Sequence, residues 1–197
     1  MKKSMRFVSV FVGVFVMMTL FAGCGFNAVI EADEDVKAGW AEVQNQYKRR
    51  ADLVPNLISV VKGASNFEQE TLQKVVEARA KATSMQVDSS TIDNPEKLHA
   101  FEQAQGQLTG ALSRLMVVVE KYPELKATEA YRDLQSQLEG TENRIAVARN
   151  RYIASVAEYN KIVLRFPSMI GAKMRSMSVR PTFEGTAGQE NAPAVQF

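Results

Sequence analysis

The sequence predicts an all-α protein, an elongated antiparallel bundle of four helices, two or three of them long, with an irregular C-terminal tail. Three observations predict this class. Between about residues 31 and 166, apolar residues recur at alternating spacings of three and four, the heptad spacing of packed helices. No stretch of this region sustains the period of two that is typical of strands. Turn-forming and helix-stopping residues separate the heptad runs.

The first helix is predicted over residues 31–62. Its heptad continues through Pro55 without a slip and ends before Gly63. Arg50 is the exception in the pattern, because a guanidinium stands where an apolar side chain is expected. The heptad positions are Val36, Trp40, Val43, Tyr47, Arg50, Val54, Leu57 and Val61.

The second helix is predicted over residues 66–86, which are rich in good helix formers. The third is predicted over residues 95–121, with Asn94 as its N-cap and Pro95 as its first residue, where the missing N–H of proline costs nothing. The heptad positions of the third helix are Leu98, Phe101, Gln105, Leu108, Leu112, Leu115, Val119 and Tyr122.

The fourth helix is predicted over residues 128–166, with Thr128 as a candidate cap. After Pro167 the heptad dissolves, so residues 167–197 are predicted to form an extended or mobile tail. The heptad positions of the fourth helix are Tyr131, Leu134, Leu138, Thr141, Ile145, Ala148, Tyr152, Ser155, Tyr159, Ile162 and Phe166.

Residues 1–23 have the three-part organisation of a secretory signal peptide. A basic start (MKKSMR) precedes an unbroken apolar run over residues 7–22, and Gly23 precedes the single cysteine, Cys24. Residues 20–24 (LFAGC) resemble a bacterial lipobox, although Phe21 stands where leucine is usual. This resemblance implies cleavage before Cys24 and a diacylglycerol on its thiol, followed by a short linker over residues 24–30.

Two other interpretations of this region remain open. The apolar run could be an uncleaved anchor, although 16 helical residues span only about 24 Å of a hydrocarbon core of about 30 Å. Cys24 could also be a buried free thiol. If the organism has two membranes, Gly25 favours the outer one, because an aspartate there would resemble an inner-membrane retention signal.

The composition excludes several functional classes. Three of the 24 basic residues lie in the first six positions, which leaves 21 against 22 acidic residues, so no nucleic acid is expected as a partner. With one cysteine and one histidine, His99, neither a structural metal site nor a catalytic triad is expected. Common nucleotide-binding and hydrolase motifs are absent from the sequence. We therefore expect no cofactor, no metal and no catalysis, and identify no small-molecule substrate.

Several motifs of the chain are specific enough to identify a family. They are YKRRADLVPNL at residues 47–57, VKG at 61–63, EKYPELKA at 120–127, TENRIA at 141–146, Tyr159-Asn160 and Phe166-Pro167. Together they resemble the LemA family of bacterial envelope proteins. Residues 23–27 (GCGFN) resemble its lipoprotein branch, with Phe26 where tyrosine is usual. The resemblance implies long antiparallel helices attached to a membrane, no established enzymatic reaction, and possible partners among membrane proteins with a TPM domain.

Arg50 is the centre of the candidate site. A buried guanidinium without a partner costs several kcal/mol, so we expect it to pair with Glu139 or Glu142 of the fourth helix. The candidate residues form either a buried polar network that sets helix register or a groove for a partner. They are Arg49, Arg50, Asp52, Asn56, Glu142 and Arg144.

The expected function is that of a membrane-anchored helical lipoprotein, acting as an interaction or scaffold protein on the extracytoplasmic side of the cell envelope. The alternative is a ligand- or signal-sensing module with a polar groove near Arg49, Arg50 and Asp52. Tight pairing of these charges favours the scaffold, and an open gap with unpaired charges favours the sensor.

Overall fold

The computed structural model describes residues 2–64, 67–85 and 87–183, with side chains from residue 27 onward except that of Ser89. These residues form helices and no strand, which confirms the all-α class. The α-helices are α1 (Lys2–Lys62), α2 (Gln69–Ser84), α3 (Pro95–Val119), α4 (Pro123–Lys126), α5 (Glu129–Leu164) and α6 (Ser168–Met174), and a 3-10 helix, η1 (Ser89–Thr91), precedes α3.

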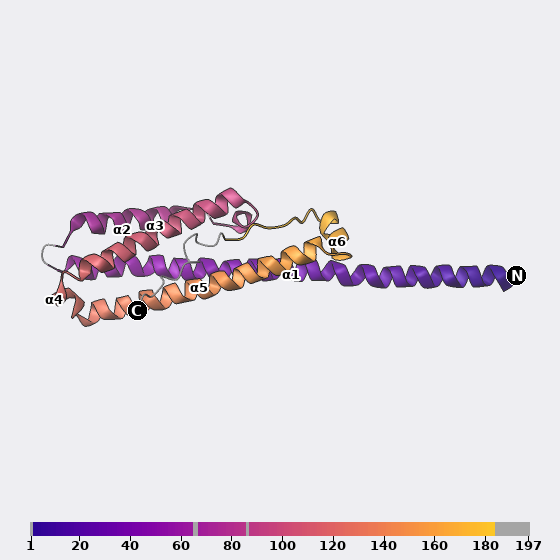
Figure 1. Cartoon of the computed structure of the whole chain (residues 1–197), viewed down its shortest axis with the longest axis horizontal. Coiled ribbons are helices and arrows are strands. Elements are labelled where there is room, and N and C mark those ends of the chain that lie inside the picture. Colours follow the sequence, from indigo (N-terminus) through magenta and orange to yellow (C-terminus); the bar gives the residue numbers. More distant parts are fainter. Residues whose placement is uncertain (1, 65–66, 86, 184–197) are drawn as a thin grey trace, which may run out of the picture.

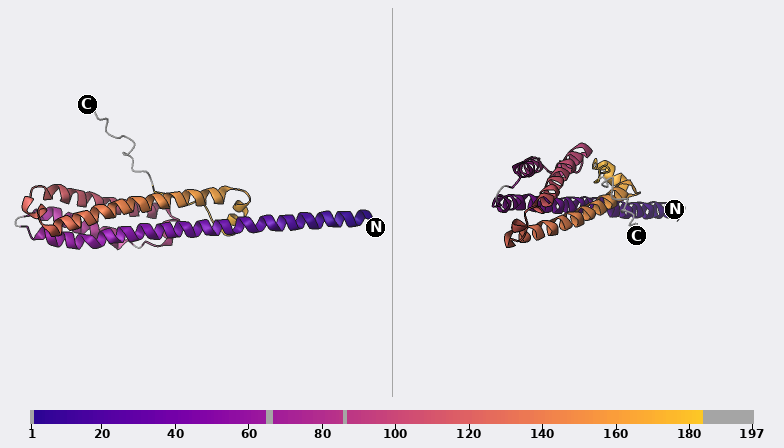
Figure 2. Two further views of the ribbon diagram at one scale, coloured as in Figure 1. Left: turned by 90° about the horizontal axis from the view of Figure 1, so that it is seen from below. Right: turned by 60° about the vertical axis from the view of Figure 1, so that its left-hand side comes forward.

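The molecule is built from two antiparallel helix pairs of unequal length (Figure 1). Helices α1 and α5 form the long pair, and α2 and α3 form the shorter pair, which lies along the C-terminal half of α1. The N-terminal part of α1 projects beyond all other elements, as the two further views also show (Figure 2). The four predicted helices correspond to α1, α2, α3 and α5, while α4 and α6 are short helices that the sequence reading did not separate.

Two of the helix starts follow from local capping, as predicted. The Asn94 side chain accepts hydrogen bonds from the backbone N–H groups of Glu96 and Lys97, and Pro95 is the first residue of α3. The Thr128 hydroxyl accepts from the backbone N–H of Tyr131 at the start of α5. These caps satisfy N–H groups that have no partner within their own helix.

The core lies along the predicted heptad positions. All eight of those on α1 are buried, including Arg50. The apolar core is divided into two clusters: one extends from Val29 to Tyr47 on α1, and the other from Val54 to Val61. Arg50 lies between them.

On α5 the predicted heptad positions are all buried as far as Tyr152, and beyond it only Tyr159 is. Beyond it the buried residues are Val156, Tyr159 and Val163, while Phe166 is 74% exposed. The predicted positions Ser155 and Ile162 are half-buried. An α-helix has 3.6 residues per turn, so a strict seven-residue repeat drifts off the contact line, and an extra step of four brings it back. On α1, the buried residues Ala32, Val36 and Trp40 are likewise spaced by four. The Trp40 ring packs against the ring of Tyr152.

Two predicted segments need correction. Residues 24–30 are not a linker, because α1 runs through them and Val29 is fully buried in the first cluster. Within the predicted tail, residues 168–174 form α6, and Ala172 and Phe183 are buried against the α1–α5 pair. This segment is held in place by apolar contacts with residues that are distant in the sequence. A heptad pattern cannot predict such contacts. Residues 184–197 lie outside the described residues.

The side chains of the predicted signal peptide and of Cys24 lie outside the described residues, although the backbone of α1 is helical from Lys2 onward. Where side chains are described, no helix is long and apolar enough to cross a membrane.

Candidate functional site

Arg50 points its guanidinium into the contact between α1, α3 and α5. Its side chain is 1% exposed, and its Nη1 donates to the Glu142 carboxylate at 2.9 Å and to the Thr109 hydroxyl at 2.6 Å. Its Nη2 donates to the Gln105 side chain at 2.7 Å and to the Gln105 carbonyl at 3.1 Å. The guanidinium carbon lies 5.0 Å from the ring centroid of Tyr47. Arg50 is thus held by two other helices and by the aromatic ring one turn earlier on α1.

Glu142, rather than Glu139, is the carboxylate that Arg50 contacts. Glu139 is exposed and accepts from Gln135 on its own helix. The side chain of Glu142 is 41% exposed, so one partner of the ion pair reaches solvent while the other is enclosed. Removing Arg50 would therefore leave a carboxylate that solvent can reach, whereas removing Glu142 would leave an enclosed guanidinium without its counter-ion.

The acceptors for Arg50 on α3 were not among the residues predicted from the sequence. Thr109 accepts from Arg50 and donates to the Gln105 carbonyl. Gln105 occupies a heptad position, and a buried amide at such a position is itself a signal of a polar contact across the core. Thr109 is exposed and does not occupy a heptad position, so the sequence pattern gave no indication of its role.

Helix α2 joins the same level of the bundle through a backbone carbonyl. Pro55 has no N–H, so the carbonyl of Ala51, four residues earlier, loses its usual partner within α1. The Nε of Arg79 on α2 donates to that carbonyl at 2.8 Å. A second helix therefore satisfies the acceptor that the proline leaves open.

We call Arg50, Arg79, Gln105, Thr109 and Glu142 the polar layer. It receives at least one residue from each of α1, α2, α3 and α5 and separates the two apolar clusters. A buried polar contact of this kind restricts register, because sliding a helix by one turn would leave the guanidinium enclosed by apolar side chains without partners.

The other candidate residues do not join the polar layer. Arg49, Asp52 and Asn56 are exposed on α1, and Arg144 is exposed on α5. Arg144 lines an open groove of about 590 Å³ between α1 and α5. The other lining residues are Glu42, Gln46, Asn143, Val147, Ala148 and Arg151. The six predicted residues therefore divide into an internal pair, Arg50 and Glu142, and four surface side chains.

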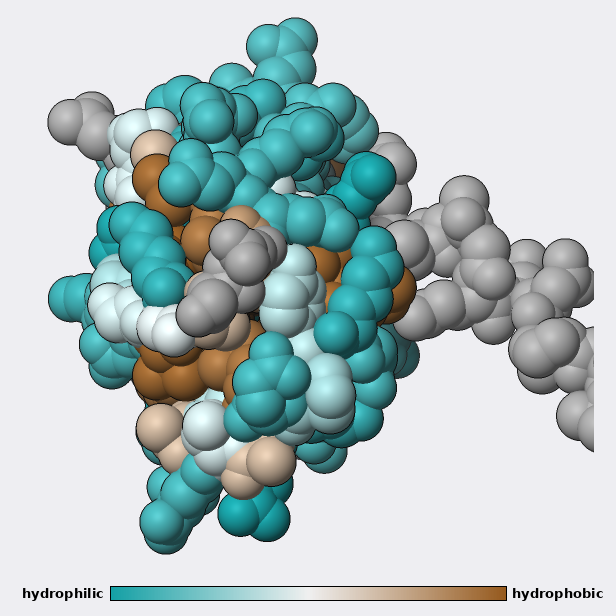
Figure 3. Space-filling model, turned by 90° about the vertical axis from the view of Figure 1, so that its left-hand side faces the viewer, coloured by the Kyte–Doolittle hydropathy of each residue, from teal (hydrophilic) through white to brown (hydrophobic). Residues whose placement is uncertain are grey.

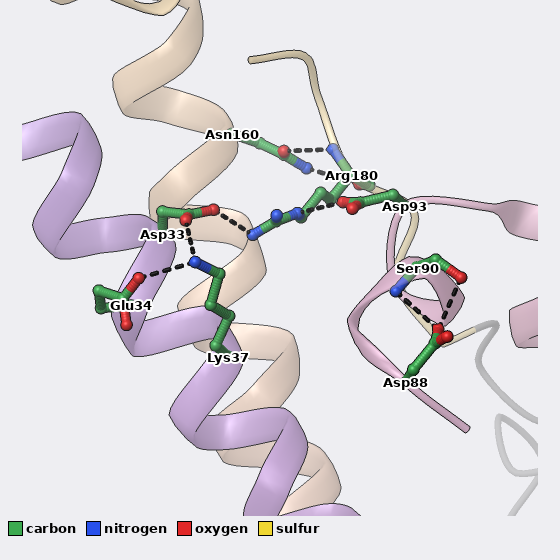
Figure 4. Close-up of polar contacts among 8 residues, drawn as sticks. All are labelled: Asp33, Glu34, Lys37, Asp88, Ser90, Asp93, Asn160 and Arg180. Carbon is green, nitrogen blue, oxygen red and sulfur yellow. Dashed lines mark hydrogen bonds and ion pairs between the residues drawn. The ribbon is translucent and has the colours of Figure 1, made fainter. Parts of the chain in front are cut away.

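A second polar cluster surrounds Arg180, in the chain that follows α6 (Figure 4). The Nε of Arg180 donates to Asp93 at 2.7 Å, and its Nη1 lies 2.7 Å from Asp33, as an ion pair without hydrogen-bond alignment. The backbone of Arg180 exchanges two hydrogen bonds with the Asn160 side chain. Burial lowers the pKa of Arg180, but the Asp93 hydrogen bond and the nearby carboxylates outweigh it and raise the pKa overall.

This cluster ties the end of the chain to three distant elements. Asp33 belongs to α1, Asp93 to the loop before α3, and Asn160 to α5. Lys37 adds a second cation on Asp33 at 2.8 Å. Near Asp93, Ser90 donates to Asp88 from both its backbone and its hydroxyl, and these bonds help to lower the pKa of Asp88. We call Asp33, Lys37, Asp93, Asn160 and Arg180 the clasp. Its two basic and two acidic side chains balance in charge.

An aromatic group lies between the polar layer and the clasp. Phe183 packs against Trp40 and Tyr152, and Phe101 packs against Trp40 and Tyr47. Arg149 lies 4.2 Å above the Phe183 ring; it also donates to the Tyr47 hydroxyl and to Glu102. Burial raises the pKa of the Tyr152 hydroxyl, which has no hydrogen-bond partner among the described residues.

In the described part of the chain, no three histidine, cysteine or acidic side chains gather as metal ligands. His99 is exposed on α3. The arrangement as described holds helices together and presents charged faces to solvent.

Comparison with known proteins identifies the family. A sequence model of the LemA family matches residues 39–197. The magnetosome protein MamQ of Magnetospirillum gryphiswaldense is 25% identical over 158 residues, which cover 72% of this chain and 58% of MamQ. Protein LemA of Metamycoplasma hominis is 26% identical over 144 residues, which cover 73% of this chain and 58% of that protein. The matched region thus spans little more than half the length of these relatives. Because the family model covers most of the sequence, the chain belongs to the LemA family.

Proposed function

We propose that this protein is a lipid-anchored scaffold of the cell envelope, held at the extracytoplasmic membrane surface through Cys24 and presenting its helical bundle to other envelope proteins. The observation that carries the proposal is the enclosure of Arg50. The guanidinium is 1% exposed and makes four hydrogen bonds to α3 and α5. The most unusual residue of the heptad is therefore used to join helices.

The alternative, a sensing module with a polar groove near Arg49, Arg50 and Asp52, has weaker support. Such a groove needs the Arg50 charge to face a ligand, whereas its hydrogen bonds go to neighbouring helices. Arg49 and Asp52 are exposed side chains on the outside of α1.

The surface offers places for protein contacts. Figure 3 shows the end of the bundle far from the N-terminus, where apolar surface appears between hydrophilic side chains. Val117 near the end of α3 is an exposed apolar residue. Membrane proteins with a TPM domain are the partner class that the family resemblance suggests. If the cell has two membranes, we place the protein at the outer one, because Gly25 follows Cys24.

The anchor is tested by replacing Cys24 with alanine in cells supplied with a labelled fatty acid. We expect the wild type to carry the label and to fractionate with membranes. Cys24→Ala should lose the label and remain uncleaved or become soluble. Asn27→Ala, three residues later, is the matched control and should behave as the wild type. If wild type and Cys24→Ala migrate and fractionate alike and neither is labelled, the anchor is wrong.

The scaffold role is tested by crosslinking in intact cells. A photoreactive residue replaces Val117 on α3 in one variant and Arg132, on the exposed side of α5, in a comparison variant. We expect specific adducts with an envelope membrane protein, and their loss in Cys24→Ala. Adducts that persist unchanged when the protein is released from the membrane would contradict a role that depends on anchoring.

A further inference from the structure

We propose that residues 164–179, which run from the last residue of α5 through α6 to the chain just beyond it, form a second membrane contact that lies on an anionic phospholipid surface beside the lipid anchor. The inference rests on the proposed anchoring through Cys24 and adds a surface that binds lipid directly. We call residues 164–179 the elbow.

The elbow concentrates exposed apolar side chains. Of the eight large apolar side chains that stand out as exposed in the described part of the chain, five lie in it. Single exposed apolar residues are common, but a concentration of them in one segment indicates a contact with a partner or with lipid. The five are Leu164, Phe166, Ile170, Met174 and Val179.

The charge of the same region has one sign. Residues 159–183 contain five basic residues and no acidic residue. Arg180 is turned inward to the clasp. The others, Lys161, Arg165, Lys173 and Arg175, are exposed. Apolar side chains bordered by basic ones match the boundary between acyl chains and anionic headgroups.

The position of the elbow favours a membrane over a protein partner. Helix α6 lies at the end of the bundle from which the N-terminal part of α1 projects (Figures 1 and 2). Ala172 of α6 belongs to the same apolar cluster as Val29 of α1. Cys24 precedes Val29 by five helical residues, about 7.5 Å along the axis, which is close to the depth of one headgroup layer. A lipid on Cys24 therefore brings the elbow to the bilayer surface.

The acidic side chains at this end lie outside the elbow. Glu158 on α5 is paired with Lys161, and others lie on α1. Glu31, Glu34 and Asp35 are exposed on α1, and Glu34 is paired with Lys37. Asp33 is enclosed by Arg180 and Lys37. The elbow itself therefore presents only positive charge.

The contact is measured with the full chain reconstituted into vesicles that contain a brominated phosphatidylcholine, with or without phosphatidylglycerol. Phe166→Trp places a fluorophore in the elbow, and Val117→Trp places one at the far end of the bundle. The native Trp40 is buried, and the wild type gives its background. We expect bromine to quench the new tryptophan of Phe166→Trp, more strongly with phosphatidylglycerol, and to leave that of Val117→Trp unquenched.

Charge reversal adds a second arm. Each basic side chain near an anionic surface contributes about fivefold in affinity, equivalent to about 1 kcal/mol. Arg165→Glu with Lys173→Glu, added to Phe166→Trp, should remove the extra quenching that phosphatidylglycerol causes. Arg132→Glu, an exposed position near the start of α5, is the matched control and should not.

The outcomes separate the two proposals, because flotation with neutral vesicles reports the anchor independently. A chain that floats while both new tryptophans are equally quenched, or equally unquenched, retains its anchor and overturns the elbow contact. A chain that does not float but is quenched at Phe166→Trp with anionic lipid supports the elbow and overturns the anchor. Failure of both readouts overturns both.

Discussion

Arg79 of α2 donates a hydrogen bond at 2.8 Å to the backbone carbonyl of Ala51 in α1. That carbonyl is open because Pro55, four residues later, lacks the backbone N–H that would otherwise donate to it. A helix interrupted by proline is thus completed by a side chain from its neighbour.

The first prediction concerns this pair. Arg79→Met should lower the free energy of unfolding by about 1–3 kcal/mol, because it leaves the Ala51 carbonyl without a donor. In a Pro55→Ala background the new N–H can reach that carbonyl, so the same substitution should cost less than about 1 kcal/mol. Urea unfolding of both single variants and the double variant measures the coupling. Lys81→Met, an exposed position on α2, serves as the control, and an equal cost of Arg79→Met in both backgrounds would exclude the relationship.

The second prediction concerns Arg50 and Glu142. Arg50→Met should cost about 1–3 kcal/mol, because the buried Gln105 acceptors lose their donor while Glu142 remains in contact with solvent. Glu142→Gln leaves the enclosed Arg50 without its counter-ion. Because the carboxylate is 41% exposed and the pairing is partly screened, the cost should be about 2 kcal/mol, below that of breaking a fully buried pair. The double variant should lose less than the sum of the two single changes.

The neighbouring Arg49→Met controls for loss of a surface charge and should stay within about 0.5 kcal/mol of the wild type. Additive losses for Arg50 and Glu142 would show that the contact has no energetic weight. If Arg50→Met unfolds as the wild type does but loses its crosslinked partner, the residue has a functional role.

The third prediction concerns the approach of α1 to α5 at Gly39. A Cβ there would lie 3.3 Å from the Ser155 Oγ and 3.4 Å from the Tyr152 Cα, whereas one on Gly110 would meet nothing within 4 Å. Gly110→Ala should therefore stabilise the protein by about 0.5–1 kcal/mol through helix propensity. Gly39→Ala should gain less, and Gly39→Val should cost about 1–3 kcal/mol through overpacking. Thermal or urea unfolding checks the order, which an equal gain at both glycines would refute.

The fourth prediction concerns alkaline pH. Burial raises the pKa of Tyr131, Tyr152 and Tyr159 above the ordinary value of 10.0. Because the folded state holds these protons more tightly than the unfolded state, their contribution to stability is complete below pH 10 and declines as the pH rises above it. Urea unfolding monitored by circular dichroism should therefore show decreasing stability above pH 10, together with delayed tyrosinate absorbance.

Tyr152→Phe provides the control for this effect. Its hydroxyl has no hydrogen-bond partner among the described residues, so removing it should not lower stability at neutral pH. The variant should also lose less stability at alkaline pH than the wild type. A wild type whose five tyrosines all ionise near pH 10 while it remains folded would contradict the burial effect.

The sequence alone determined the helical class, most of the helix positions, and the buried side of α1, of α3 and of α5 as far as Tyr152. These features depend on neighbours within one or two turns. The side chains of Asn94 and Thr128 cap the helices that follow them, and the spacing of Val36, Trp40 and Val43 places them on one side of α1. The heptad also marked Arg50 as a buried charge that needs a partner, which narrowed the choice to Glu139 or Glu142.

Only the tertiary structure decided the contacts made between helices. The choice of Glu142, the acceptors Gln105 and Thr109, and the donor Arg79 all depend on how neighbouring helices are rotated and displaced along their axes. The burial of Phe183 and the clasp around Arg180 depend on a chain that returns to α1 after more than a hundred residues. Such contacts have no local period, because their energy comes from partners that only the folded chain brings together.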